Sequence, residues 1–313
     1  MIRAVVLGAA AGGGFPQWNS NGASCRRARG GLDRCALPRT QASLAVSSDG
    51  LSWFLLNASP DLRQQIAATP RLHPREGLRS TPIAGVLLTG GEVDAVAGLL
   101  SLRERQALRL VATEAVLRLL DANPIFEALA RDFVPRERVA LDRRFPLRKA
   151  DGAPTGLHAV LFPVPGTMPL YMESRIVAPR RAEIDDADGI TTGVIIDDGV
   201  RRLLYIPGCA AMTGAVRENL HGADVIFFDG TLWQDDEMIR ASLGPKTGRR
   251  MGHMSISGEQ GVIAALAGLD LGRKVLIHLN NSNPVLLDDT PERRVVEAAG
   301  WEVAYDGMEM TLS

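Results

Sequence analysis

Short runs of apolar residues recur along the whole chain, and polar or glycine-rich segments separate them. Runs of this length without a helical repeat are typical of buried strands. The turn sequence SSDG separates two of these runs and Asp198-Gly199 separates two others, which favours one hairpin in each half of the chain. Strands are predicted at residues 2–7, 42–47, 52–57, 83–88, 109–111, 158–164, 193–197, 202–206, 225–228, 274–279, 301–305 and 308–312.

Helical patterns lie between several of these strands. The clearest is the segment 94–105, whose leucines fall on one side of a helix. Because some strands form hairpins and others alternate with helices, we expect two mixed sheets with helices outside, one sheet from each half. Further helices are predicted at 114–120, 124–130, 258–267 and 295–299, and loops at 148–155 and at the strongly charged segment 178–189.

The composition is that of a globular protein, with 46% hydrophobic and 23% charged residues among 313. This length allows two domains or one large layered domain. A net charge of −1 argues against a nucleic-acid partner held by a general positive field. Three cysteines favour a reducing compartment, and no apolar run approaches the roughly 20 residues of a membrane span. With no secretory signal at the N-terminus, a cytoplasmic protein without membrane contact is predicted.

A glycine-rich segment, GAAAGGG, follows the first predicted strand at residues 8–14. Glycines in this place sometimes admit the pyrophosphate of a dinucleotide. Here the spacing differs from GxGxxG, and the following FPQWNS does not predict the helix that such a site needs. A tight turn from strand to loop is therefore preferred.

Carboxylate and imidazole side chains follow several predicted strands or their loops. Such positions gather at one edge of a layered α/β fold, and these groups are ligands for divalent metals. Taken singly, an aspartate there is more often a turn or cap residue, and a histidine is more often structural. His73, His158 and His221 receive that structural interpretation. The candidate site residues are Glu92, Asp94, Asp229, His253 and His278.

These blocks carry a resemblance to known families. TGGEVDAVAGLL stands where metallo-β-lactamase-fold proteins carry HxHxDH, and IFFDGT, GHMS and IHLNNSNP resemble later blocks of the RNase Z-like branch. Over almost its full length the chain resembles the PqqB family of pyrroloquinoline quinone (PQQ) biosynthesis. The stretches LGAAAGGGFPQWN, FFDGTLWQDDEMI and GPKTGRRMGHMSISGE carry much of this second resemblance.

The resemblance implies an αββα sandwich of the metallo-β-lactamase type, formed as a single domain over 1–313. It implies an iron-dependent enzyme that hydroxylates the tyrosine moiety of a Glu–Tyr unit, with Zn²⁺ as the alternative metal. Two rivals stay open: a PQQ-binding carrier that assists transport to the periplasm, and a metal-dependent hydrolase. The implied partners are a small peptide-derived substrate or PQQ and other PQQ-pathway proteins, and a homodimer is compatible with the fold.

The sequence departs from the family pattern at the first metal-binding block. Gly90 and Glu92 stand at the first two histidine positions, and Ala95 stands where a histidine ligand is usual. Alanine has no donor atom, so its presence weakens the expected site. Three explanations stay open: an engineered change that disarms the site, a natural site held by the remaining ligands, or loss of the metal chemistry.

A second departure concerns a cysteine-rich zinc knuckle that many relatives carry after the PQWN block. Ser20 and Gly22 occupy cysteine positions here, which leaves Cys25 with Cys35 nearby. Two thiols do not make the four-ligand site that structural zinc requires, so no structural zinc knuckle is predicted.

If the protein is an iron-dependent hydroxylase, the predicted metal ligands are Asp94, His253 and His278, with Glu92 as a further carboxylate. His253 has a second possible role in acid–base catalysis, and Asp229 is expected to orient a histidine. The superfamily's metal-bridging position falls near Gly208-Cys209, where no aspartate is present, which disfavours two-metal hydrolysis. Substrate carboxylates are expected to meet Arg63, Arg79, Lys246 and Arg250, for which solvated ion pairs are the equal alternative.

Overall fold

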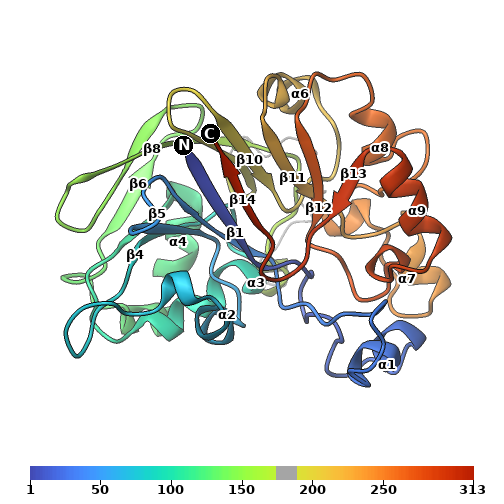
Figure 1. Cartoon of the computed structure of the whole chain (residues 1–313), viewed down its shortest axis with the longest axis horizontal. Helices are drawn as coiled ribbons and strands as arrows, with labels where there is room; N and C mark the ends of the chain where they lie inside the picture. Colours follow the sequence, from blue (N-terminus) through green and yellow to red (C-terminus); the bar gives the residue numbers. More distant parts are fainter. Residues whose placement is uncertain (174–188) are drawn as a thin grey trace.

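Two seven-stranded sheets face each other in the computed structural model, with helices on their outer sides (Figure 1). The structure describes residues 1–173 and 189–313. The first sheet has the order β14-β1-β2-β3-β4-β5-β6, with bounds Glu309–Leu312, Ile2–Gly8, Ser43–Ser47, Trp53–Leu56, Ile83–Leu87, Arg109–Thr113 and Arg136–Val139. The second has the order β13-β12-β11-β10-β9-β8-β7, with bounds Trp301–Val303, Arg273–Ile277, Val225–Asp229, Arg202–Ile206, Thr192–Asp197, Pro154–Pro163 and Phe145–Arg148.

Each half of the chain supplies most of one sheet, with one exchange. The C-terminal strand β14 leaves the second half and pairs antiparallel with β1 in the first sheet. Both predicted hairpins are confirmed, because β2 pairs antiparallel with β3 and β9 with β10. Strands β10 to β13 then run parallel, so their carboxyl ends lie at one edge of the second sheet.

The alternation of side chains along β11 shows how the core is divided. Val225 and Phe227 point between the sheets, whereas Ile226 and Phe228 belong to the cluster under the outer helices of the second sheet. All four are fully buried, because a strand covered on both faces has no polar side. A third cluster fills the space between the first sheet and its own helices.

The helices are short and cover the outer faces. In Figure 1, α2 and α4 lie over the first sheet, while α6, α8 and α9 lie beside the second. Their bounds, from α1 to α9, are Ala23–Arg29, Leu62–Ala68, Val93–Val96, Glu114–Asp121, Leu170–Glu173, Gly214–Leu220, Glu237–Arg240, Val262–Ala265 and Pro291–Ala298. Five 3₁₀ helices span Pro70–Leu72, Ala97–Leu102, Pro124–Ala128, Arg249–Met251 and Pro284–Leu286 among the described residues.

The predicted helix at 94–105 is wrong in its length. The structure has only the four-residue α3 followed by the 3₁₀ helix Ala97–Leu102. The loop after β3 causes this, because Ala58 donates its N–H to the carbonyl of Ala95 and accepts the N–H of Gly98. These tertiary bonds replace bonds that a continuing α-helix would make.

The other differences are smaller. The predicted helix at 258–267 shrinks to α8, since the chain before it turns at Gly258 with φ +91°. The segment 124–130 forms the 3₁₀ helix Pro124–Ala128. Strands β6 and β7 were not predicted, because they are edge strands whose exposed positions hide the apolar pattern. The loop predicted at 178–189 lies, apart from Gly189, outside the described residues.

Substitution of Gly98 by alanine is expected to destabilise the fold. A Cβ atom at this position would lie 2.0 Å from the carbonyl oxygen of Ser59 and 2.8 Å from that of Ala58. Because both are backbone atoms, the loop must shift, and we expect a loss of at least about 2 kcal/mol in thermal or urea unfolding. Gly214→Ala is the control, since nothing lies within 4 Å of its added Cβ. Equal stability of the two variants would contradict this close packing of Gly98 against the loop.

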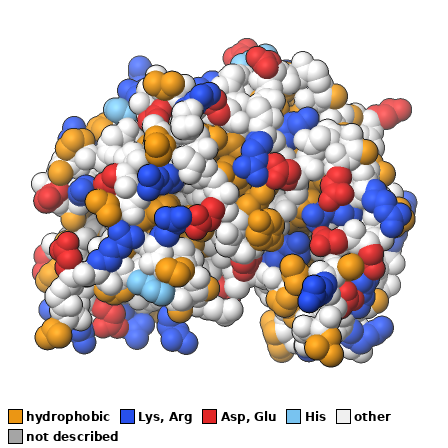
Figure 2. All heavy atoms as spheres, in the orientation of Figure 1, with side chains coloured by type: hydrophobic (Ala, Val, Ile, Leu, Met, Phe, Trp, Pro, Cys, Tyr) orange, Lys and Arg blue, Asp and Glu red, His pale blue; other side chains and the backbone are white. Residues whose placement is uncertain are grey.

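The surface carries both signs of charge without a dominant field. Figure 2 shows basic and acidic side chains interspersed over the visible face and a notch at its lower edge, near α1. Among the described residues, no helix combines the length and the apolar character needed to cross a bilayer.

Candidate metal centre

A cleft of about 670 Å³ opens at the carboxyl ends of the parallel strands. The glycine-rich segment forms part of its wall through Gly12 and Gly13, so the predicted turn lies beside the site. A Cβ on Gly12 would lie 3.6 Å from Oδ2 of Asp94, which shows how closely the loop passes the carboxylate. The start of α3, from Glu92 to Ala95, forms the facing wall.

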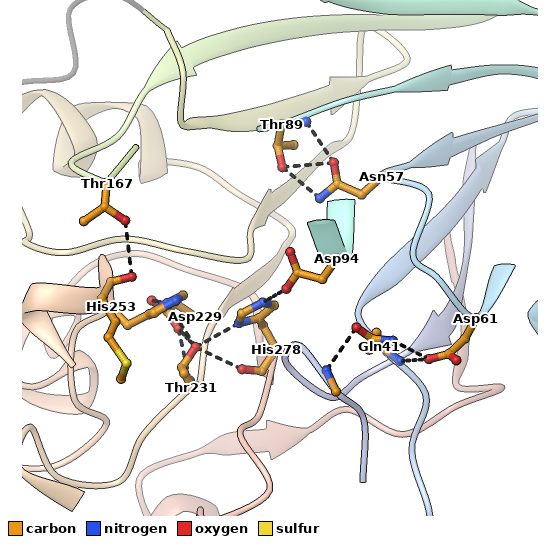
Figure 3. A network of polar contacts seen from close by, with 12 residues as sticks. Gln41, Asn57, Asp61, Thr89, Asp94, Thr167, Asp229, Thr231, His253 and His278 are labelled. Atoms are coloured by element: carbon orange, nitrogen blue, oxygen red, sulfur yellow. Dashed lines mark hydrogen bonds and ion pairs between the residues drawn. The ribbon is translucent and has the colours of Figure 1, made fainter. Parts of the chain in front are cut away.

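Two histidines stand side by side in this cleft. His278 directly follows β12 and has φ +62°, a left-handed conformation uncommon for a residue other than glycine. His253 follows Gly252, whose φ of +90° turns the chain back toward the strands. The two imidazole rings stack with centroids 5.1 Å apart and planes 22° from parallel (Figure 3).

Asp229 lies behind these rings at the end of β11 and is fully buried. Its Oδ2 accepts the N–H of Cys209 at 2.9 Å and faces Nδ1 of His253 at 2.9 Å. Its Oδ1 accepts the N–H and the hydroxyl of Thr231 at 3.0 and 2.7 Å. Four partners use the accepting capacity of the carboxylate, so it suits orientation of His253 better than coordination.

Thr231 joins all of these groups, although it was not among the predicted site residues. Its Oγ1 lies 3.0 Å from Nδ1 of His253 and 2.9 Å from Nδ1 of His278 (Figure 3). The available signal was its position two residues after the strand-end Asp229. A hydroxyl there reaches back to the same carboxylate and forward to the next strand.

This network assigns the imidazole protons. If the Thr231 hydroxyl donates to Asp229, as its 2.7 Å distance indicates, both Nδ1 atoms carry hydrogen and donate toward Asp229 and Thr231. Both Nε2 lone pairs are then available on the side away from Asp229. Nε2 of His278 lies 2.8 Å from Oδ2 of Asp94, and two such acceptors at this distance need a proton or a cation between them.

Charge pairing shifts the titration of two of these groups. Burial opposes the charged form of His253, but the negative charge and hydrogen bond of Asp229 raise its pKa above the ordinary 6.5. Burial likewise opposes ionisation of Asp94, but the hydrogen bond and charge of His278 lower the pKa of this carboxyl below its usual range. Both shifts favour a carboxylate beside a positive charge.

The donor set fits a divalent metal. Ligand bonds of about 2.0–2.2 Å place adjacent ligand atoms roughly 3 Å apart, close to the 2.8 Å between Asp94 and His278. Asp229, His253 and His278 each offer an atom within 4.8 Å of the others. Because Asp229 is already fully hydrogen-bonded, the better set is Asp94, His278 and Nε2 of His253.

Two residues of the first metal-binding block lie beside this set. Glu92 precedes α3 and lines the cleft, but it is not among the closely spaced donors. Its role as a further carboxylate stays a prediction. Ala95 is buried in α3, packs in the cluster between the first sheet and its helices, and also lines the cleft, so this position borders the site.

The four predicted substrate-binding cations divide into two pairs. Lys246 and Arg250 line the cleft. Arg63, on α2, and Arg79 are exposed and do not line it. The structure therefore places only the first pair where a ligand in the cleft would meet them.

The cysteines of the former knuckle region lie in or near α1. Cys25 is buried, with Sγ 3.6 Å from Oδ1 of Asn281, and Cys35 is half-buried. Neither belongs to a group of three or more metal-ligating side chains in the described part of the chain. The absence of a structural zinc knuckle stays a prediction.

Comparison with known proteins first defines the class. The model of the beta-lactamase superfamily domain matches residues 52–279, and the fold is the αββα sandwich of the metallo-β-lactamase type that the sequence predicts. More particularly, the chain belongs to the family of coenzyme PQQ synthesis protein B. It is 64% identical over 311 residues to that protein from Gluconacetobacter diazotrophicus, covering 99% of this chain and 100% of the relative.

Other similar proteins support the same family or the same fold. The coenzyme PQQ synthesis protein B of Gluconobacter oxydans is 53% identical, with 100% of this chain and 99% of the relative covered. The crystal structure of Zn(2+)-bound PqqB from Methylobacterium extorquens superposes with a TM-score of 0.91 at 48% identity, covering 99% of this chain and 100% of that one. A diphosphatase of the PhnP family shares the fold, with a TM-score of 0.65 at 20% identity over 99% of this chain and 96% of that one.

Proposed function

We propose that the protein acts in PQQ biosynthesis as an iron- and O₂-dependent hydroxylase of the tyrosine moiety of a Glu–Tyr-derived intermediate. The observation that carries the proposal is the convergence of Asp94, His253 and His278 on one cleft, with both imidazoles held through Nδ1. Membership of the coenzyme PQQ synthesis protein B family supports the pathway.

Asp94, His253 and His278 would hold the metal. Two histidines and one carboxylate are the donor set of non-haem Fe(II) oxygenases, and they leave coordination positions open. When bound, ferrous iron would supply activation of O₂ for insertion of one oxygen atom into an aromatic ring, and an external two-electron reductant would be needed to convert the second oxygen atom to water. Asp229 and Thr231 fix the ring planes of both histidines, so the Nε2 atoms stay directed away from the buried carboxylate.

The cleft also supplies groups for the organic substrate. Lys246 and Arg250 line it and provide positive charge for carboxylates of a peptide-derived molecule. As an alternative to coordination, His253 would hold or accept a proton at Nε2, with Asp229 stabilising the charged imidazole. A two-metal hydrolase is less well supported, because Gly90 and Gly208 line the cleft without a donor side chain.

A PQQ carrier is the second candidate function. The observation in its favour is the same pair of cations, Lys246 and Arg250, beside a cleft of about 670 Å³, since PQQ is a planar tricarboxylate. Stoichiometric PQQ binding without iron-dependent turnover would favour the carrier over the hydroxylase.

Anaerobic reconstitution with ferrous iron tests the metal centre, in the parent protein and in Ala95→His. We expect both proteins to retain about one iron per chain, with tighter retention in Ala95→His because a fourth donor is added at the cleft wall. Iron content after desalting and oxygen consumption with a Glu–Tyr peptide are the measurements.

The outcomes separate the candidates. Iron in Ala95→His alone would make Ala95 a disarmed ligand position, and the hydroxylase assignment would then not hold for this chain. Iron in neither protein would overturn the metal centre and favour the carrier.

A further inference from the structure

Tyr205 is a polar residue at the inner wall of the cleft that the proposed function leaves without a role. It lies in β10, paired with Val194 on one side and Phe227 on the other. Its side chain is fully buried in the cluster between the two sheets, yet the residue lines the cleft. A phenylalanine would satisfy the packing equally well.

The Tyr205 hydroxyl has no partner in hydrogen-bond geometry in the described part of the chain. The amide of Asn57 acts on the phenol oxygen as a donor and lowers the pKa of Tyr205. The Oδ1 of Asn57 accepts the N–H and the hydroxyl of Thr89, so the Tyr205 proton has no acceptor there. Buried hydroxyls almost always find a partner, so an orphaned one beside a cleft indicates an acceptor that reaches it only when the cleft is occupied.

The missing acceptor must come from a side chain of the wall, because almost no surface of the Tyr205 oxygen is open to water. Asp94 is the suitable group. It lines the same cleft, and its negative charge acts on Tyr205, where burial and this charge together raise the pKa of the phenol. At present Oδ2 of Asp94 is held by Nε2 of His278 at 2.8 Å, the contact that a bound cation would replace.

We propose that Tyr205 is a positioning residue of the metal centre, whose hydroxyl donates to the Asp94 carboxylate when a divalent cation occupies the site. The inference rests on the proposed metal site. The hydrogen bond would fix the orientation of a ligating carboxylate, as outer hydrogen-bond partners of metal ligands commonly do. In the metal-free protein the hydroxyl stays without this bond.

Tyr205→Phe tests the proposal, since it removes one oxygen and keeps the ring. Cobalt(II) is the probe, and its visible absorption reports both affinity and ligand geometry. Titrations are made in the parent background and in the Ala95→His background, with Tyr305→Phe as the control, because Tyr305 is exposed and does not line the cleft. The thermal midpoint of each metal-free protein is measured alongside.

We expect about 10-fold weaker cobalt binding and an altered cobalt spectrum in Tyr205→Phe, with no effect in Tyr305→Phe. The metal-free midpoint is expected to stay unchanged or to rise, because no hydrogen bond is lost. Unchanged cobalt binding would overturn the proposal while leaving the metal centre intact, even if PQQ binding were weakened. A lowered metal-free midpoint would overturn it too. If cobalt binds in neither background, the proposed metal centre is wrong, and the inference about Tyr205 fails with it.

Discussion

Replacing His278 with alanine is expected to abolish metal retention and, with it, any iron-dependent turnover. The substitution removes the Nε2 atom that faces Asp94 and the Nδ1 contact with Thr231. Because a ligand is lost, the fall in metal affinity should exceed the roughly 10- to 100-fold cost of losing an outer partner. Metal content after desalting, together with equilibrium titration, measures the effect.

His221→Ala is the matched control for this experiment. His221 is exposed at the end of α6, and its backbone carbonyl, rather than its ring, accepts the Arg202 guanidinium. We expect this variant to bind metal as the parent does. Unaltered metal affinity in His278→Ala would show that the cation, if bound, sits elsewhere.

Asp229→Asn is expected to damage both the site and the fold. The amide has one accepting oxygen in place of two, so N–H groups of Cys209 and Thr231 compete for it while a new N–H donor faces them. An unsatisfied buried group costs about 1–3 kcal/mol, and loss of histidine orientation lowers metal affinity by about 10- to 100-fold. Urea unfolding and cobalt titration measure the two effects. Asp236→Asn, at an exposed Arg240 pair, is the control.

Asp229→Asn is also expected to change how the stability of the metal-free protein depends on pH. Because the folded protein raises the pKa of His253 above 6.5, its protonation stabilises the metal-free fold below pH 6.5. That stabilisation is lost as the pH rises through the raised value. We therefore expect the parent to lose more stability than Asp229→Asn does as the pH rises above 6.5. Parallel curves for the two proteins would contradict the charge pairing.

The buried strands were predictable because each is a short continuous run of apolar residues, and packing against other elements does not change its secondary structure. The runs at 225–228 and 274–279 correspond to β11 and β12, which are covered on both faces. The helices were less predictable, since tertiary bonds set their ends. The Ala58 loop stops α3 by bonding Ala95 and Gly98, residues distant from it along the chain. The local periodicity of the sequence does not indicate hydrogen bonds between such distant residues.

The candidate site shows the same division. Asp94, Asp229, His253 and His278 were predicted because all follow strands or their loops. The structure brings Asp94, His253 and His278 to one cleft, with Asp229 buried behind His253. Arg63 fell within a matched block, yet the turn of α2 directs it to solvent. Thr231 and Tyr205 were missed, because only the three-dimensional structure shows what surrounds them. The Thr231 hydroxyl meets both histidines, whereas the Tyr205 hydroxyl meets no partner in hydrogen-bond geometry in the described part of the chain.

The pairing of β14 with β1 has a consequence for how the chain is assembled during synthesis. β1 is synthesised before the other described strands, but its outer partner, residues 309–312, is synthesised after them. Until these are made, one side of β1 exposes unpaired backbone groups, an edge open to wrong partners. The first sheet therefore waits for the synthesis of β14 before it is complete, and a nascent chain stalled before residue 309 would be prone to aggregation.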